Sequence, residues 1–147
     1  MVNISDKIRF NFRLNSSLDK SSLKKQPEGK TLHDVDGDFQ IHIDNVPYLD
    51  ETEFLILEFG ILLKKWVRKF NEGEITNFIY NSIEHDSPIL EFRYINGTWK
   101  IYSDWRVSER EVVLSSDELL DLSERFLEEL EHSLKDTYGI ELKTGIL

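Results

Sequence analysis

The sequence predicts a single α+β domain over residues 1–147, in which two amphipathic helices cover a mostly antiparallel sheet of about five to seven strands. Two kinds of pattern support this prediction: short runs that alternate apolar and polar residues, and two long runs with helical periodicity. The elements follow the order β-β-(β)-α-β-β-β-(β)-α, with the two shortest strands in parentheses. Because short links join consecutive strands, we expect neighbouring strands to pair antiparallel.

The first strands lie before residue 50. Residues 7–14 alternate basic or polar side chains with apolar ones, which predicts a half-buried strand with a basic outer face. Residues 15–30 are rich in Ser and Lys and contain one Pro and one Gly, which predicts a flexible loop inside the domain. Residues 39–43 predict a second strand, and a turn at Asp44–Asn45 leads into a short edge strand at 46–49.

We expect the first helix to run from Asp50 to about Asn71. Asp50 stands where an N-cap is expected, and Glu53 three residues later completes a pattern like a capping box. The helix has one broad apolar face, and Glu58 lies on the opposite, polar side. Three further apolar residues fall on that polar side and indicate either a second covered surface or an exposed strip: Phe54, Leu57 and Ile61.

The clearest local feature is a hairpin around Asn96–Gly97, which follows a strand expected over residues 75–83. Asn-Gly tolerates the positive φ that both central residues of a type I′ turn require. The two-residue loop sets the register and so divides the side chains between two faces. We expect the core face to carry Leu90, Phe92, Tyr94, Trp99, Ile101 and Trp105. The outer face then carries Glu91, Arg93, Lys100, Tyr102 and Asp104.

The final helix is predicted over residues 116–138, after a short strand at 112–114. Ser115 and Glu118 form a capping box at its start, and Gly139 closes it. Its apolar face consists of Leu119, Leu120, Phe126, Leu127, Leu130 and Leu134. The i, i+4 spacing predicts two ion pairs on its surface, Asp121–Arg125 and Glu131–Lys135.

Composition excludes several classes of site. The chain has no cysteine, so it holds no disulfide, Cys-ligated zinc, iron–sulfur cluster or thiol nucleophile. It also lacks the Gly-x-Gly-x-x-Gly and Walker A motifs of nucleotide sites and the Gly-x-Ser-x-Gly motif of hydrolases. We therefore expect no cofactor.

Charge indicates which partners are compatible with the chain. The formal net charge is −10, and residues 1–30 carry a net charge of +4, so residues 31–147 carry −14. Such a body repels nucleic acid and anionic membranes and attracts basic macromolecules. No apolar run is long enough for a transmembrane helix or a signal peptide, so we expect a cytoplasmic protein.

Two groups of residues are candidates for binding a protein partner. The final helix presents Asp117, Asp121, Glu124 and Glu128 opposite or close to opposite its leucines, which suits electrostatic attraction of a basic protein. The hairpin's outer face combines an aromatic side chain with acids, as interface hot spots do. The residues concerned there are Glu91, Tyr102 and Asp104.

Two segments of the sequence carry a resemblance. Residues Leu57–Phe70 (LEFGILLKKWVRKF) and Ile83–Trp105 (IEHDSPILEFRYINGTWKIYSDW) resemble a group of small bacterial proteins. In size, acidity and lack of cysteine this group is similar to the immunity proteins of bacterial toxin–immunity systems. The resemblance implies a non-enzymatic inhibitor that occludes the active or substrate-binding face of one cognate toxin, often a basic nuclease.

Two alternatives remain open at the level of sequence. The first is a small metal-dependent hydrolase that uses His33, Asp36 and His42, since these side chains are common ligands of metal ions. The second is a regulatory module that associates with itself through the strip formed by Phe54, Leu57 and Ile61. For the favoured function we expect a monomer or a weak homodimer.

Overall fold

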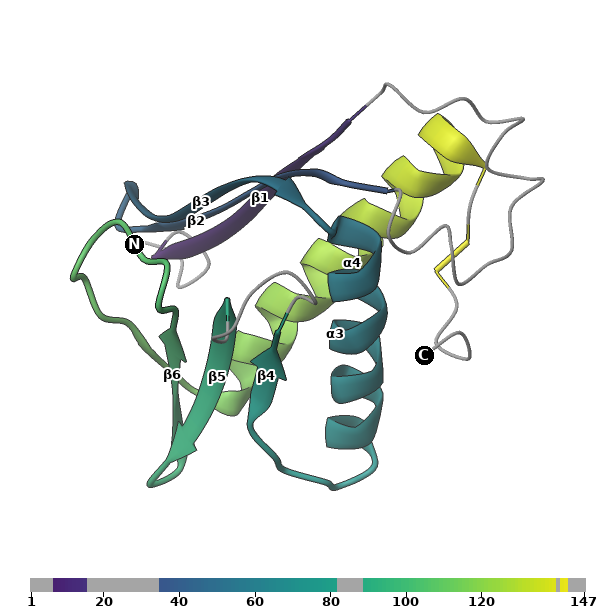
Figure 1. The fold of residues 1–147 in the computed structure, drawn as a ribbon. Helices are drawn as coiled ribbons and strands as arrows, with labels where there is room; N and C mark the ends of the chain where they lie inside the picture. Colours follow the sequence, from purple (N-terminus) through teal and green to yellow (C-terminus); the bar gives the residue numbers. More distant parts are fainter. Residues whose placement is uncertain (1–6, 16–34, 82–88, 140, 143–147) are drawn as a thin grey trace.

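The computed structural model describes residues 7–15, 35–81, 89–139 and 141–142 (Figure 1). Within these ranges the chain forms seven strands and two helices in an α+β fold. The fold class and the approximate order of elements predicted from the sequence are confirmed. Residues 16–30, for which we predicted a flexible loop, lie outside the described residues.

The strands before the first helix form a three-stranded antiparallel sheet in the order β1-β2-β3. Its strands are β1 (Ile8–Leu14), β2 (Gly37–Ile43) and β3 (Val46–Phe54). The predicted turn between β2 and β3 is confirmed, since Asp44 and Asn45 have φ values of 51° and 66°. Both residues adopt the left-handed conformation that short polar side chains tolerate best.

The strands after the first helix form a separate four-stranded antiparallel sheet in the order β4-β5-β6-β7. Its strands are β4 (Phe78–Tyr80), β5 (Leu90–Ile95), β6 (Thr98–Tyr102) and β7 (Val113–Leu114). The seven strands thus divide between two sheets where we expected one, because the first helix separates β3 from β4 and packs against both. Of the strand expected over residues 75–83, the described part contains only the three residues of β4.

The register of the β5–β6 hairpin is the predicted one. Tyr94 pairs with Trp99, and Phe92 pairs with Ile101. The core face is confirmed except at its two ends, where Tyr94 is 40% and Trp105 is 43% exposed. Trp105 lies beyond the end of β6. Tyr94 is displaced from the core because the larger ring of its partner Trp99 fills the space against Trp66 and Phe70.

The second helix, α4 (Ser116–Tyr138), begins and ends where the sequence predicts. The Ser115 hydroxyl accepts a hydrogen bond from the Glu118 backbone N–H at 3.2 Å, and the Glu118 carboxylate accepts one from the Ser115 N–H at 3.1 Å. Gly139 follows in the left-handed conformation with φ of 67°. The capping box and the glycine stop are therefore both confirmed.

The first helix, α3 (Ile56–Asn71), begins later than predicted. Asp50 is not an N-cap: it lies within β3 opposite Gln40, whose amide donates to its carboxylate at 3.1 Å. Leu55 occupies the cap position and makes no hydrogen bond through its side chain. Strand pairing continues through this segment because it buries Leu49 and Phe54 against the core, and this burial outweighs the local capping signal.

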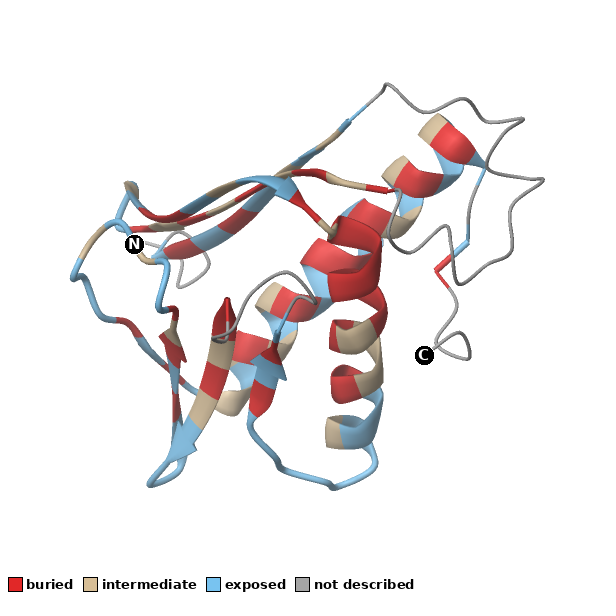
Figure 2. Ribbon diagram, viewed as in Figure 1, coloured by how far each residue is buried: buried red, intermediate tan, exposed pale blue. Residues whose placement is uncertain are grey.

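Each helix contacts both sheets, and the buried side chains lie on the surfaces that the sheets and helices turn toward one another (Figures 1 and 2). Figure 1 shows the three-stranded sheet above, with α4 running behind the strands of the four-stranded sheet. Aromatic rings dominate this core. The Phe59 ring lies 5.2 Å from Phe39, 5.5 Å from Phe126 and 5.3 Å from Tyr80, so one side chain joins elements from both sheets and α4.

The strip at Phe54, Leu57 and Ile61 is buried, so it cannot serve as the self-association surface considered above. Phe54 belongs to β3, and α3 is covered on more than one side. Gly60 permits close approach of α4, because a Cβ at that position would lie 2.5 Å from a Leu130 methyl group. The prediction that Glu58 lies on a polar, solvent-facing side of the helix is also wrong, because β4 packs on that side. Glu58 is 6% exposed, and its carboxylate accepts a hydrogen bond from the Tyr80 hydroxyl at 3.1 Å.

Among the described residues, neither helix is long and apolar enough to cross a membrane.

Candidate functional site

The outer face of the β5–β6 hairpin holds a cluster around Tyr102. The guanidinium of Arg93 lies 4.0 Å from the centre of the Tyr102 ring, and that of Arg106 lies 5.0 Å from it. The Tyr102 hydroxyl donates to Asp104 at 2.5 Å, and Arg93 Nε donates to Glu91 at 2.5 Å. The structure therefore brings together the three hairpin residues that the sequence singled out, Glu91, Tyr102 and Asp104.

Arg106 fixes this cluster to the end of β6. Its Nη1 donates to the Ser103 carbonyl at 2.9 Å, and its Nε donates to Glu109 at 3.2 Å. Hydrogen bonding to Tyr102, and then to Glu109, raises the pKa of Arg106 above its ordinary value, so the guanidinium stays charged. The Tyr102 ring is thus held by two cations and one carboxylate. This arrangement restricts its side-chain motion before any partner binds.

Apolar side chains surround the cluster on the same face of the four-stranded sheet. Ile79 lies opposite Glu91 in the register and is 54% exposed. Val113 lies opposite Lys100 and is 44% exposed. No described element covers this face. The sequence did not single out Ile79 and Val113, since their position beside the hairpin depends on the pairing of β4 and β7, which local patterns do not reveal.

The four acidic residues singled out on α4 are exposed, as predicted: Asp117, Asp121, Glu124 and Glu128. Arg125 pairs with Asp121 at 3.0 Å, which confirms one predicted ion pair. The other prediction is wrong, because Glu131 pairs with Lys64 of α3 and not with Lys135. Packing of α4 against α3 brings Lys64 to this carboxylate.

The acidic residues of α4 and the Tyr102 cluster lie on different surfaces. The side chains of the cluster alternate along the strands with those that pack on the helices, so they point away from α3 and α4. The acids point away from the apolar face with which α4 contacts the core. The structure therefore does not join the two predicted groups into one contact surface.

The proposed metal ligands do not converge in the described structure. His33 lies outside the described residues. Asp36 and His42 are six residues apart along extended chain, which corresponds to roughly 20 Å and is too far for two ligands of one ion. His42 Nδ1 instead lies 3.2 Å from the Asn11 side-chain nitrogen. Within the part of the chain that is described, no three His, Asp or Glu side chains are grouped to hold a metal ion.

Fold and site define a small α+β domain that presents an exposed sheet face with a fixed aromatic residue. The chain belongs to the family described as a domain of unknown function (DUF7878), whose model matches residues 10–136. That match spans both sheets and nearly all of α4. No curated protein and no solved structure matches the chain.

Proposed function

We propose that the protein is a non-enzymatic inhibitor that binds one partner protein, and most concretely an immunity protein that neutralises a basic toxin domain in the cytoplasm. The observation that carries this proposal is the Tyr102 cluster on an exposed sheet face. Aromatic residues and arginines are enriched among the residues that dominate binding energy at protein interfaces. Here they are already ordered in the free protein, which lowers the entropic cost of association.

The exposed face of the four-stranded sheet is the contact surface in this proposal. Tyr102 acts as the central anchor, and exposed apolar residues around it, such as Ile79 and Val113, exclude water from the contact. The charged groups of the cluster alternate in sign, with Glu91, Arg93 and Asp104 in contact with one another or with Tyr102. Such a pattern favours a partner with the complementary arrangement and so supplies specificity.

The acidic face of α4 has a different role in this proposal. Since it lies away from the Tyr102 cluster, it acts through the electric field of the whole molecule and not by direct contact. A net charge of −10 accelerates encounter with a basic protein, and this effect weakens as salt is added. The partner class expected is therefore a basic protein whose functional face is covered on binding.

The test combines capture of the partner with an inhibition assay. The tagged protein and two variants, Tyr102→Ala and Tyr94→Ala, are incubated with lysate of cells that produce the protein and of neighbouring strains. Tyr94 provides the control because it is an exposed tyrosine on the same strand pair but on the opposite face, whereas Tyr102 is half-buried within its cluster.

The proposal expects a stoichiometric partner that wild type and Tyr94→Ala retain and that Tyr102→Ala loses. It also expects wild type to inhibit that partner's activity in the purified pair. Equal retention by all three proteins would overturn the assignment of the contact surface. A bound partner whose activity is unchanged at saturation would overturn the inhibitor function.

A further inference from the structure

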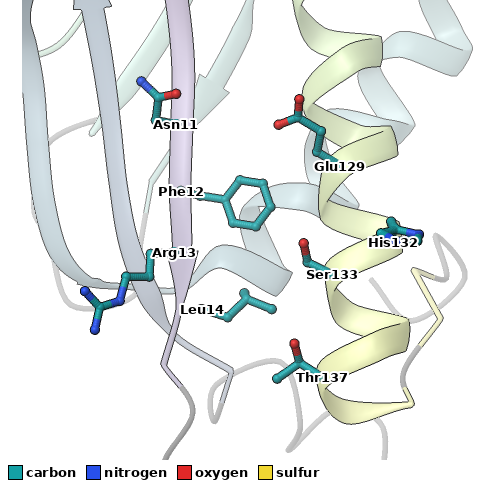
Figure 3. Close-up of a pocket in the computed structure, with 8 residues that line it drawn as sticks. All are labelled: Asn11, Phe12, Arg13, Leu14, Glu129, His132, Ser133 and Thr137. Carbon is teal, nitrogen blue, oxygen red and sulfur yellow. The ribbon is translucent and has the colours of Figure 1, made fainter.

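A groove runs between β1 and α4, on the far side of β1 from the rest of its sheet (Figure 3). Its cavity volume is about 560 Å³. Four successive residues of β1 line one wall, and α4 supplies the other wall with Glu129, His132, Ser133 and Thr137. Neither β2 nor β3 contributes a lining residue. The groove therefore follows the outer edge of β1.

The backbone of β1 presents hydrogen-bonding groups to this groove. Among the strands that the structure describes, β1 is an edge strand that pairs only with β2. The Lys7 carbonyl accepts from Asp44 at 2.8 Å, and the Asn15 N–H donates to Asp36 at 3.0 Å, so the odd-numbered residues of β1 bond to β2. The N–H and C=O groups of Phe12 and Leu14 consequently point outward. In the described part of the chain they have no partner on that side.

The side chains beside this edge form an apolar floor. Phe12 and Leu14 point from β1 toward α4, whereas Arg13 points away from the helix (Figure 3). Ile8 and Phe10, earlier on the same strand, are buried, but Phe12 and Leu14 are only half-buried. β1 and α4 therefore separate along this stretch and leave part of two apolar side chains accessible.

We propose that this groove binds an extended peptide segment of a partner protein, which adds to the sheet as a fourth strand beside β1. Binding of this kind gains affinity from main-chain hydrogen bonds and specificity from alternate side chains. The inference does not rest on the inhibitor function proposed above. It assigns a second interaction surface, defined by the β1 edge and α4.

Charge specifies the sequence pattern of the bound segment. Side chains of an added strand that point toward α4 meet Phe12 and Leu14, and an acid there would be repelled by Glu129. Side chains on the opposite face lie next to Arg9 and Arg13, which are both exposed. The occupant is therefore a segment that alternates apolar and acidic residues.

The same arginines disfavour pairing between two copies of the chain. An antiparallel pair of β1 strands centred on Asn11 places Arg9 of one copy directly opposite Arg13 of the other. Like charges in this position destabilise a sheet. A partner with acidic residues at these positions replaces that repulsion by attraction.

Amide hydrogen exchange in the free protein tests whether the edge is available. We expect slow exchange at Arg9, Asn11 and Arg13, which bond to β2, and fast exchange at Phe12 and Leu14. Protection of the last two amides in dilute monomer would overturn the proposal, since the edge would then be occupied already. Protection that appears only with a concentration-dependent dimer would overturn it in favour of self-pairing.

Binding is tested with an acetylated and amidated seven-residue peptide of alternating valine and glutamate. We expect saturable binding that protects Phe12 and Leu14 amides, and much weaker binding of the same peptide with lysine in place of glutamate. N-methylation of one alternate set of peptide amides should abolish binding, while methylation of the other set should leave it intact. Equal affinity of the two methylated peptides would exclude strand addition.

Three variants locate the peptide. Ser133→Trp fills the groove and should remove binding, whereas Glu124→Trp, at an exposed position of the same helix away from the groove, should leave it unchanged. Arg13→Glu should weaken the glutamate peptide about two- to fivefold, as expected for loss of an exposed charge pair. Unchanged affinity in Ser133→Trp would overturn the assignment of this groove.

Discussion

Tyr48 is a single side chain that connects the two sheets. It lies in β3 and is buried, and its hydroxyl accepts from the Ser103 N–H at 3.2 Å and donates to the Ile101 carbonyl at 3.4 Å. The Val107 N–H in turn donates to the Tyr48 carbonyl at 2.8 Å. The end of β6, from which the Tyr102 cluster projects, is therefore positioned by a residue from the other sheet.

We expect Tyr48→Phe to lower the free energy of unfolding by about 1–2 kcal/mol, because the Ser103 N–H then loses its buried acceptor. Urea denaturation followed by Trp fluorescence measures the change. The matched variant is Tyr94→Phe, whose exposed hydroxyl has no such role. Equal stabilities of the two variants would show that the hydroxyl bridge does not hold the sheets together.

The same residue gives stability a dependence on alkaline pH. Burial raises the pKa of Tyr48 above its ordinary value of 10.0, so the folded protein keeps a proton that the unfolded chain releases. This contribution is complete below about pH 10 and is lost as the pH rises further. Between pH 9 and 11, unfolding free energy should therefore fall more steeply for wild type than for Tyr48→Phe. Parallel pH profiles would contradict this.

At the scale of single residues, the sequence predicted which face of a strand a side chain lies on better than it predicted how far that side chain is buried. The register around Asn96–Gly97 correctly placed Tyr102 beside Glu91, because a two-residue turn leaves no freedom in pairing. Glu58 was misplaced, since a carboxylate on an amphipathic helix is normally solvated. Its burial depends on Tyr80, a hydrogen-bond partner from β4 that lies 22 residues away in the chain.

Among the elements, α4 has residues at both ends that fix its length: the capping box of Ser115 and Glu118 at its start and Gly139 at its end. We expect Ser115→Ala to destabilise the protein by about 1 kcal/mol, because the Glu118 N–H loses its acceptor at the helix N-terminus. Ser115→Thr keeps a hydroxyl at the cap and should retain most of that stability. Thermal unfolding of the three proteins gives the comparison, and an alanine variant as stable as wild type would mean that tertiary packing alone fixes the start of α4.

The two helices differ in how far local sequence determines them. The capping box of α4 coincides with the end of a very short strand, so local and tertiary signals agree. At the start of α3 they conflict: Asp50 and Glu53 form a similar pattern, but β3 extends through it. The strand prevails because it pairs with β2 and buries two large apolar side chains, which a local capping hydrogen bond cannot match in energy.

For the whole molecule, the sequence could predict the class of fold but not its division into two sheets. Which strands pair within one sheet depends on how the segments before and after α3 pack. The apolar–polar periodicity within a single segment does not reveal this packing. Net charge behaves differently, because charges add regardless of fold. The acidity of the surface was therefore predictable, whereas the separation of the α4 acids from the Tyr102 cluster was not.

This separation permits a test of electrostatic steering apart from contact. Reversal of Asp121, Glu124 and Glu128 to Lys changes the net charge from −10 to −4, since each substitution adds two positive charges. We expect the association rate with a basic partner to fall about tenfold at low salt, with little change in the dissociation rate. The effect should disappear at high salt, where the charges are screened.

Tyr102→Ala should act on the other rate constant: it should speed dissociation and leave association nearly unchanged. The substitution removes a contact but does not alter the net charge that attracts the partner. Stopped-flow association and surface-based dissociation measurements on the same purified pair distinguish the two effects. If the triple reversal instead accelerated dissociation, the acidic face of α4 would itself touch the partner. The contact surface would then have to be moved from the four-stranded sheet to that helix.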